Sequence, residues 1–358
     1  MDKKLCKVLS PSTEKVVLQM KTMKAWQAAR NALEHVLKAK KGETLIIFCD
    51  DERKEICEPF TIGALKMELK THLVILKTQP DVFRIMVPPQ VHRILRKETP
   101  DICINLLRGN VEETPFRIEF TRMETEKDKS RIGHCPGITL DMLTDGALAL
   151  RGADHRKMQR FGRSLVRNLK GTVKLDITNA AGTKISLSVK DRPFFTDTVI
   201  DTRMTKWMNL PTGEVTVAPV ENSLQGRLIC DIAAGGIGPV KEPVEIRVKD
   251  GRVESALSAD AKILEKINNS LKSDSASDVV GEFAFGINPK ARLVREFLEA
   301  EKTLGTAHVA FGNNSDMPCG RNRSKNHMDF LISRPTVTAH KGDKASFEIL
   351  RNGTFTEF

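Results

Sequence analysis

An imidazole and a carboxylate near the end of the chain are spaced so that they can share one metal ion. His327 and Asp329 are separated by a single methionine. In an extended segment, side chains two residues apart point to the same face, so both groups can reach one point. His308 lies earlier in an alternating, mostly apolar segment, where an imidazole without a partner would be costly. These residues predict half of a metal site.

Three glutamates extend this set. Glu214 in LPTGEVTVAP and Glu282 in VVGEFAFGINP each follow a glycine in an otherwise apolar segment, an arrangement that delivers a carboxylate into a cleft without crowding it. Glu301 lies upstream of His308. Carboxylates and imidazoles without a thiolate suit a hydrolytic site with two Zn²⁺, Co²⁺ or Mn²⁺ ions. Two cations lower the pKa of a water between them, which becomes a nucleophile near neutral pH.

The first part of the chain alternates predicted helices and strands. Residues 23–38 carry apolar side chains at helical spacing. Continuous apolar runs predict strands buried on both faces over 43–49, 72–77 and 101–106, with a helix over 88–97. This alternation predicts a parallel sheet with crossover helices. We expect residues 1–128 to form an open α/β domain, and no dinucleotide site, because no GxGxxG motif follows the first strand.

The second part of the chain has a different pattern. A charged, turn-prone segment over 123–131 marks the predicted domain boundary. Beyond it, alternation of apolar and polar residues predicts hairpins over 171–189 and 244–253. Helical spacing of apolar residues predicts helices over 154–169, 259–271 and 290–301. The predicted fold class is therefore α/β, with an N-terminal open α/β domain containing a parallel sheet and a C-terminal α+β domain, residues 129–358, carrying the metal site.

Composition excludes several classes of protein. The 358 residues are 40% hydrophobic and 29% charged, as in globular proteins, and no apolar run is long enough to predict a membrane span. Seven scattered cysteines without a CxxC motif favour a reducing compartment. Because the first residues lack a secretory signal, we expect a cytoplasmic protein. The net charge of +11 is spread along the chain, without tyrosine or a recognised motif, so we expect no nucleic-acid partner.

Motifs in the second half resemble those of a known enzyme family. The segments LPTGEVTVAP, GEFAFG, an acidic residue before the AHVAFG segment, and HMDF occur in the same order, and with similar separations, as in the thermophilic metallo-aminopeptidases of the aminopeptidase T and aminopeptidase S type, which are leucyl aminopeptidase-like. The resemblance implies two divalent metal ions, removal of the N-terminal residue of a small peptide, and a homodimer. It implies catalytic roles for Glu214 and Glu282 and a ligand set of Glu214, Glu282, Glu301, His308, His327 and Asp329, with Glu299 as a rival to Glu301.

One feature of that family is missing. Its members carry a tyrosine shortly after the histidine of the AHVAFG-like strand, suited to stabilising an oxyanion, whereas this chain has no tyrosine. Arg321, Arg323 or Lys325 can supply positive charge instead, or can be solvated loop residues. Two other functions stay open. One is a dioxygenase of the 2,5-dihydroxypyridine type, with one Fe(II) held by His327, Asp329 and a third ligand, either His308 or the group at the position of Glu282; the other is a non-catalytic relative.

Overall fold

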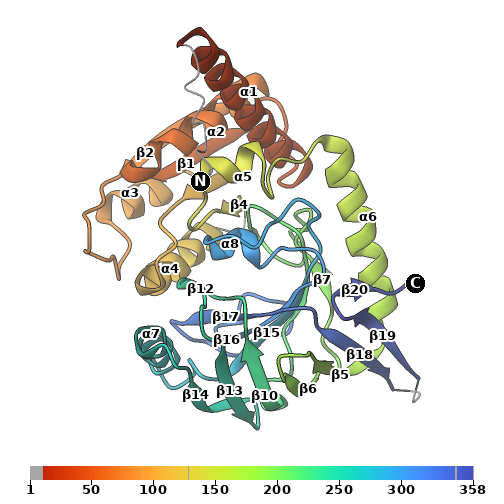
Figure 1. Ribbon diagram of the computed structural model, residues 1–358. Helices are drawn as coiled ribbons and strands as arrows, with labels where there is room; N and C mark the ends of the chain where they lie inside the picture. The colour runs from red at the N-terminus through yellow and green to blue at the C-terminus, as the bar shows by residue number, and fades with distance from the viewer. Residues whose placement is uncertain (1–10, 128, 343–344, 358) are drawn as a thin grey trace, which may run out of the picture.

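The computed structural model describes residues 11–127, 129–342 and 345–357. Within these residues the strands form three sheets, and most helices gather around the first sheet (Figure 1). In that sheet every neighbouring pair of strands is parallel. Its strands, in spatial order, are β2 (Lys70–Leu76), β1 (Thr44–Asp50), β3 (Ile102–Leu106), β4 (Arg131–His134) and β8 (Trp207–Asn209).

The parallel sheet confirms the predicted α/β arrangement. The apolar runs of β1 and β3 are buried almost throughout, because helices cover both faces of such a sheet. The strand predicted over 72–77 is also present as β2, but the prediction that it is buried on both faces is wrong. Among the residues that the structure describes, β2 pairs only with β1, and most of its side chains reach solvent at the edge of the sheet. The boundary predicted at residue 128 stays a prediction; β4 and β8 join this sheet from beyond it.

Four predicted helices are present, three of them with limits close to the prediction, whereas α1 begins at Pro11, well before the predicted residue 23. The predicted helices over 23–38, 88–97, 154–169 and 259–271 correspond to α1, α3, α6 and α7. The helices that the structure describes are α1 (Pro11–His35), α2 (Lys54–Lys66), α3 (Pro89–Lys97), α4 (Thr114–Thr125), α5 (Leu140–Thr144), α6 (Gly152–Leu169), α7 (Ala261–Leu271) and α8 (Phe297–Ala300), with short 3-10 turns η1 (Asp51–Arg53) and η2 (Val111–Glu113).

The helix predicted over 290–301 is wrong for most of its length. Only Phe297–Ala300 is helical, as α8. The preceding segment is held open by side chains from elsewhere in the fold. Arg292 donates to Glu299 at 2.8 Å and to Asp141 at 2.5 Å, and Asn288 donates to the carbonyl of Ala147 at 3.0 Å. These tertiary contacts satisfy polar groups without a helix and override the local helical spacing.

Two antiparallel sheets form the second half of the fold. Both predicted hairpins are confirmed, as β5–β6 and β13–β14. One sheet has the order β14 (Arg252–Leu257), β13 (Val244–Lys249), β10 (Gln225–Cys230), β6 (Lys184–Ser188), β5 (Thr172–Thr178), β18 (Thr336–Lys341), β19 (Ser346–Arg351) and β20 (Thr354–Phe355). The other has the order β12 (Gly238–Pro239), β11 (Ala233–Ala234), β17 (His327–Ile332), β16 (Ala307–Gly312), β15 (Val280–Gly286), β9 (Glu214–Val217) and β7 (Phe195–Thr196). One hydrophobic core takes side chains from both sheets.

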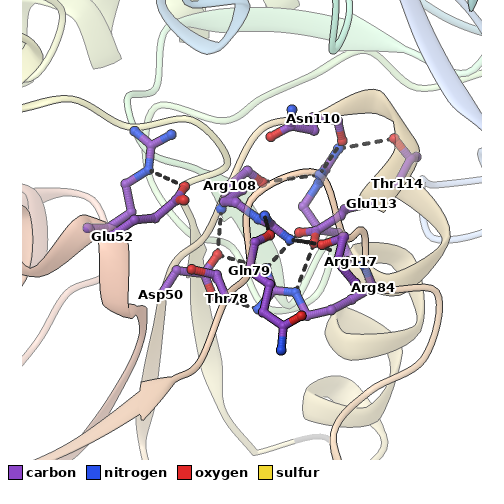
Figure 2. A network of polar contacts seen from close by, with 12 residues as sticks. Asp50, Glu52, Thr78, Gln79, Arg84, Arg108, Asn110, Glu113, Thr114 and Arg117 are labelled. Atoms are coloured by element: carbon purple, nitrogen blue, oxygen red, sulfur yellow. Dashed lines mark hydrogen bonds and ion pairs between the residues drawn. The ribbon is translucent and has the colours of Figure 1, made fainter.

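A network of ion pairs occupies the carboxyl ends of β1 and β3 (Figure 2). Arg84 bonds to Asp50 at 2.6 Å and to Glu113 at 2.6 Å, and Arg108 also pairs with Glu113. Arg117 donates to the carbonyl of Arg108 at 3.1 Å. Ligands of open α/β sheets usually bind beyond the carboxyl ends of the strands. Here the protein's own side chains fill that position.

His134, at the end of β4, is expected to make the fold sensitive to acid. Burial lowers the pKa of its imidazole to about 3, and the charge of Arg117 adds to the effect. In the unfolded chain the pKa of histidine is about 6.5. Between these two values the unfolded state therefore binds more protons, so the free energy of unfolding falls as the pH falls. Glutamine does not titrate. Between pH 7 and pH 4, the free energy of unfolding should therefore fall by about 3 kcal/mol less in His134→Gln than in the wild type.

Urea unfolding of the His134→Gln variant at pH 7 and at pH 4 checks this expectation. His72→Gln is the matched control, because His72 is an exposed histidine on β2. The control should show the wild-type dependence on pH. If His134→Gln also shows it, the neutral state of His134 does not cause the acid sensitivity.

The structure also bears on membrane association. No helix in the part of the chain that the structure describes is both long enough and apolar enough to cross a membrane.

Candidate metal centre

Five of the six predicted donors lie on four neighbouring strands of the third sheet, β9, β15, β16 and β17. Side chains alternate between the two faces of a strand. One face of these strands packs into the hydrophobic core and carries Val215, Val217, Phe283, Phe285, Val309, Phe311, Met328 and Phe330. The residues between them point to the other face, which carries Glu214, Glu282, His308, His327 and Asp329. The period of two thus produces both the core and the site.

Small residues lie opposite the donors on at least one neighbouring strand. Each donor on a strand has a glycine or alanine as a cross-strand partner: Gly286 for Glu214, Ala284 for His308, Gly312 for His327, and Ala310 for both Glu282 and Asp329; on its other side His308 pairs with Leu331. Directly paired side chains on one face of a sheet lie within contact distance of each other. Partners with little or no side chain therefore leave room beside the longer polar side chains.

The structure brings the imidazoles and carboxylates of these strands together. His308 Nε2 lies 3.6 Å from a Glu214 oxygen, 3.7 Å from an Asp329 oxygen and 4.0 Å from a Glu282 oxygen. His327 Nε2 lies 3.2 Å from Glu282 and 3.5 Å from Asp329. Two groups have donor atoms within 4.8 Å of one another and share His308; they are Glu214, Glu301 and His308, and Glu282, His308 and Asp329.

Glu301, and not its rival Glu299, reaches this cluster. Glu301 follows α8 directly and is 5% exposed. Glu299 is fully buried elsewhere, where Arg292 donates to it at 2.8 Å and the backbone N–H of Ala147 donates at 3.2 Å. The two glutamates are two residues apart in sequence, but the short helix turns their side chains in different directions. The six predicted donors therefore all lie at one place.

Asp329 is also supported from the first half of the fold. Gly235 donates its N–H to the carbonyl of Asp329 at 2.9 Å, and a Cβ at Gly235 would lie 3.0 Å from the Asp329 nitrogen. The next residue, Gly236, has a φ of +69° and packs against Val111, so that a Cβ there would lie 2.6 Å from the Val111 Cβ. Val111 begins η2, whose last residue is Glu113 of the ion-pair network. The ion-pair network around Glu113 therefore supports the backbone of Gly235 and Gly236, which contacts Asp329.

Sequence reasoning missed two residues of the cluster, Lys302 and Asp197. Lys302 is 1% exposed, and its ammonium group lies 2.6 Å from Glu214, 3.0 Å from Glu301 and 3.7 Å from Asp197. Asp197 accepts the backbone N–H of Glu214 at 2.7 Å. A lysine next to a glutamate after a helix normally indicates solvent exposure, and Asp197 lies in no motif. The signal in the sequence that could have identified Lys302 is its position next to Glu301.

Burial governs the protonation of these groups. Burial raises the pKa of the Glu301 carboxyl to about 8 and holds that of Glu214 well above its usual value. Burial alone would lower the pKa of His327, but the charges of Asp329 and Glu282 raise it well above its ordinary range. A cluster of buried carboxylates is costly unless cations neutralise it.

The donor atoms fit a divalent cation. Glu214 Oε1 and His308 Nδ1 are buried and have no hydrogen-bond partner among the residues that the structure describes. Carboxylate oxygens and imidazole nitrogens, without sulfur, are ligands that Zn²⁺, Mn²⁺ and Co²⁺ accept. The free Glu214 oxygen faces His308 Nε2 at 3.6 Å, inside one of the two groups of converging donors. A cation there would neutralise carboxylates that Lys302 alone does not balance.

The candidate oxyanion residues lie in the loop after β16. Arg321, Arg323 and Lys325 are all exposed. The backbone of Arg321 donates to Glu221 at 2.8 Å and that of Lys325 to Asp274 at 2.6 Å, which fixes the loop away from the six donors. A replacement for the missing tyrosine among these three residues stays a prediction.

Two solved structures share this fold. AmpT from Thermus thermophilus is 16% identical, with a TM-score of 0.70, and the match covers 94% of this chain and 100% of that one. The 2,5-dihydroxypyridine dioxygenase from Pseudomonas putida KT2440 is 14% identical, with a TM-score of 0.68, and the match covers 94% of this chain and 97% of that one. Both likenesses establish the fold, mixed α/β with one parallel and two antiparallel sheets. Among curated proteins, none matches this chain.

A family profile matches the part of the chain that holds all six donors. The profile describes a thermophilic metalloprotease (M29) and covers residues 154–355, more than half of the chain. Membership in a metalloprotease family implies a divalent metal ion and hydrolysis of peptide bonds. The donors that converge on the third sheet have the chemistry that such an ion needs. The chain therefore belongs to the thermophilic metalloprotease family M29.

Proposed function

We propose that the protein is a metal-dependent aminopeptidase that removes the N-terminal residue of small peptides. The observation that carries this proposal is the convergence of six oxygen and nitrogen donors, five on one face of one sheet and Glu301 directly after α8, in a member of a metalloprotease family. The residues that would hold the metal are Glu214, Glu282, Glu301, His308, His327 and Asp329.

The charge of the cluster favours two divalent ions. Its acidic members are Asp197, Glu214, Glu282, Glu301 and Asp329, and Lys302 is the cation among them. With neutral imidazoles and ionised carboxyls, five negative charges and one positive charge leave a net charge of −4. Two divalent cations neutralise it, whereas one leaves an excess of buried negative charge, which is unfavourable.

When bound, such ions polarise a peptide carbonyl and make hydroxide available near neutral pH. Glu282 is ionised at neutral pH, as a metal-binding carboxylate must be. Burial alone would raise the pKa of its carboxyl, but the hydrogen bond with His327 and the charges of both histidines lower it to about 2. Its Oε1 accepts the Thr216 hydroxyl at 2.5 Å, which fixes the carboxylate. We infer that a carboxylate of the centre, Glu214 or Glu282, accepts a proton from the attacking water and returns it to the leaving amine.

One alternative has an observation in its favour. His308 and His327 both lie within 4 Å of Asp329, and two histidines with one carboxylate are the ligands of mononuclear Fe(II) oxygenases. A dioxygenase also shares the fold. The additional carboxylates Glu214, Glu282 and Glu301 favour the hydrolase, because they bring more negative charge than one Fe(II) neutralises. A non-catalytic relative is the remaining alternative.

Metal content and turnover, measured together, test the proposal. We expect protein purified without chelator to contain about two equivalents of Zn, Co or Mn by mass spectrometry, and to release p-nitroaniline from Leu-p-nitroanilide after addition of Co²⁺ or Zn²⁺. One equivalent of iron without hydrolysis would favour the dioxygenase. Protein that neither binds metal nor hydrolyses the substrate would be a non-catalytic relative.

Other expectations stay predictions. We propose a homodimer in the cytoplasm that acts on small peptides, without nucleic-acid or membrane partners.

A further inference from the structure

Solvent reaches the metal centre from one side. The side chain of His327 is 29% exposed, and those of Glu282 and Asp329 are each 12% exposed. On the opposite side, His308 is 2% exposed and Lys302 is 1% exposed. A peptide must therefore approach the centre over His327.

The loop between β16 and β17 places Asp316 on this accessible side. The carbonyl of Asn313 accepts a hydrogen bond from His327 Nδ1 at 2.8 Å. The side-chain amide of the same Asn313 donates to Asp316 Oδ1 at 2.9 Å. One residue therefore joins the Asp316 carboxylate to the most exposed imidazole of the centre.

Trp207 holds the other oxygen of the same carboxylate. Its indole Nε1 donates to Asp316 Oδ2 at 2.8 Å. Trp207 is itself fixed in β8 of the parallel sheet, where its ring packs at right angles to that of His134, 6.0 Å away. Each Asp316 oxygen thus accepts one hydrogen bond and keeps a second lone pair. Asp316 is solvent-exposed, so these lone pairs are available to a ligand.

Asp316 differs from the other acidic groups around the centre. Glu214, Glu301 and Asp197 are buried against Lys302. Asp316 lies next to the centre, because Asn313 bonds both to its carboxylate and to His327. Among the carboxylates described around the centre, Asp316 is the one that is exposed, is not one of the six donors and does not pair with Lys302.

An enzyme that removes N-terminal residues needs a group of this kind. The amino terminus of a peptide is an ammonium group one residue away from the bond to be cleaved, and a fixed carboxylate binds it by charge-assisted hydrogen bonds. We propose that Asp316, held by Trp207 and Asn313, binds the N-terminal ammonium group of the substrate. This inference rests on the proposed function and names its substrate class, peptides with an unblocked amino terminus.

Asp316→Asn tests the assignment, with Ser315→Ala as the matched control from the same loop. Ser315 is exposed and bonds only to Asn313 among the described residues. With Zn²⁺-loaded protein, the KM for Leu-p-nitroanilide should rise about 10- to 100-fold in Asp316→Asn, because a charged hydrogen bond is lost. The metal content should stay at the wild-type value, and kcat should change less than KM. Ser315→Ala should behave like the wild type.

A blocked substrate gives the second comparison. The wild-type protein should not hydrolyse N-acetyl-Leu-p-nitroanilide at a rate comparable to that of the free-amine substrate. Comparable hydrolysis of both, or an unchanged KM in Asp316→Asn at normal metal content, would show that Asp316 does not recognise the amino terminus.

Binding of an amine separates this inference from the proposed function. Isopentylamine carries the leucine side chain and the amine but no bond to cleave, and its affinity can be measured by calorimetry on Zn²⁺-loaded protein. It should bind the wild type at least about 10-fold more tightly than Asp316→Asn. If the wild type hydrolyses neither substrate, the proposed function fails. The affinities of the wild type and of Asp316→Asn for isopentylamine still test the role of Asp316, and equal affinities would overturn that role.

Discussion

Replacing His308 or Asp329 by alanine is expected to abolish peptide hydrolysis and to lower the metal content of the purified protein. His308 belongs to both groups of converging donors, and Asp329 lies within 4 Å of both imidazoles. Loss of a group that orients a ligand already weakens metal binding about 10- to 100-fold, so loss of a ligand itself should weaken it more.

The two variants should keep the fold. The strands that carry His308 and Asp329 are held by core side chains on the opposite face, and these are unchanged in both variants. Circular dichroism and gel filtration check the fold, and mass spectrometry checks the metal. His340→Ala is the matched control, because His340 also contacts a carboxylate, Asp176 at 2.7 Å, outside the cluster. Wild-type metal content in both site variants would contradict the assignment of the centre.

Replacing Lys302 by methionine is expected to destabilise the metal-free protein by about 3–5 kcal/mol. Lys302 bonds to Glu214 at 2.6 Å and to Glu301 at 3.0 Å, and all three side chains are almost fully buried. Removing one partner of a buried ion pair leaves an uncompensated buried charge, which typically costs this amount. Methionine keeps most of the volume of the lysine stem, so the loss reports the ammonium charge rather than a cavity.

Urea unfolding in the presence of a chelator measures this loss. Lys262→Met is the control, because Lys262 is exposed on α7, where replacing a lysine should change stability by less than about 0.5 kcal/mol. A free energy of unfolding for Lys302→Met equal to that of the control would mean that the glutamates are neutral in the metal-free protein and need no counter-ion. Lys302→Arg retains the charge and should lose less stability than Lys302→Met.

The strands of the site could be predicted because their chemistry is local. Alternation with a period of two places Glu282, His327 and Asp329 on the face opposite a row of phenylalanines, and this pattern is readable in the residues themselves. The parallel sheet could be predicted for the same reason, since a continuous apolar run indicates a strand between two layers. Burial on both faces was wrong for β2, because its place at the edge depends on strand order.

The sequence alone determined which residue types the chain offers for metal binding and which faces of its strands they share, because both follow from chemistry and spacing along the chain. Tertiary structure decided the rest. The choice of Glu301 over Glu299, the burial of Lys302 between carboxylates, and the position of Asp316 between Trp207 and His327 depend on contacts between segments far apart in the chain. The electrostatic energy of a buried charge is set by what surrounds it in space, and local spacing does not contain that information.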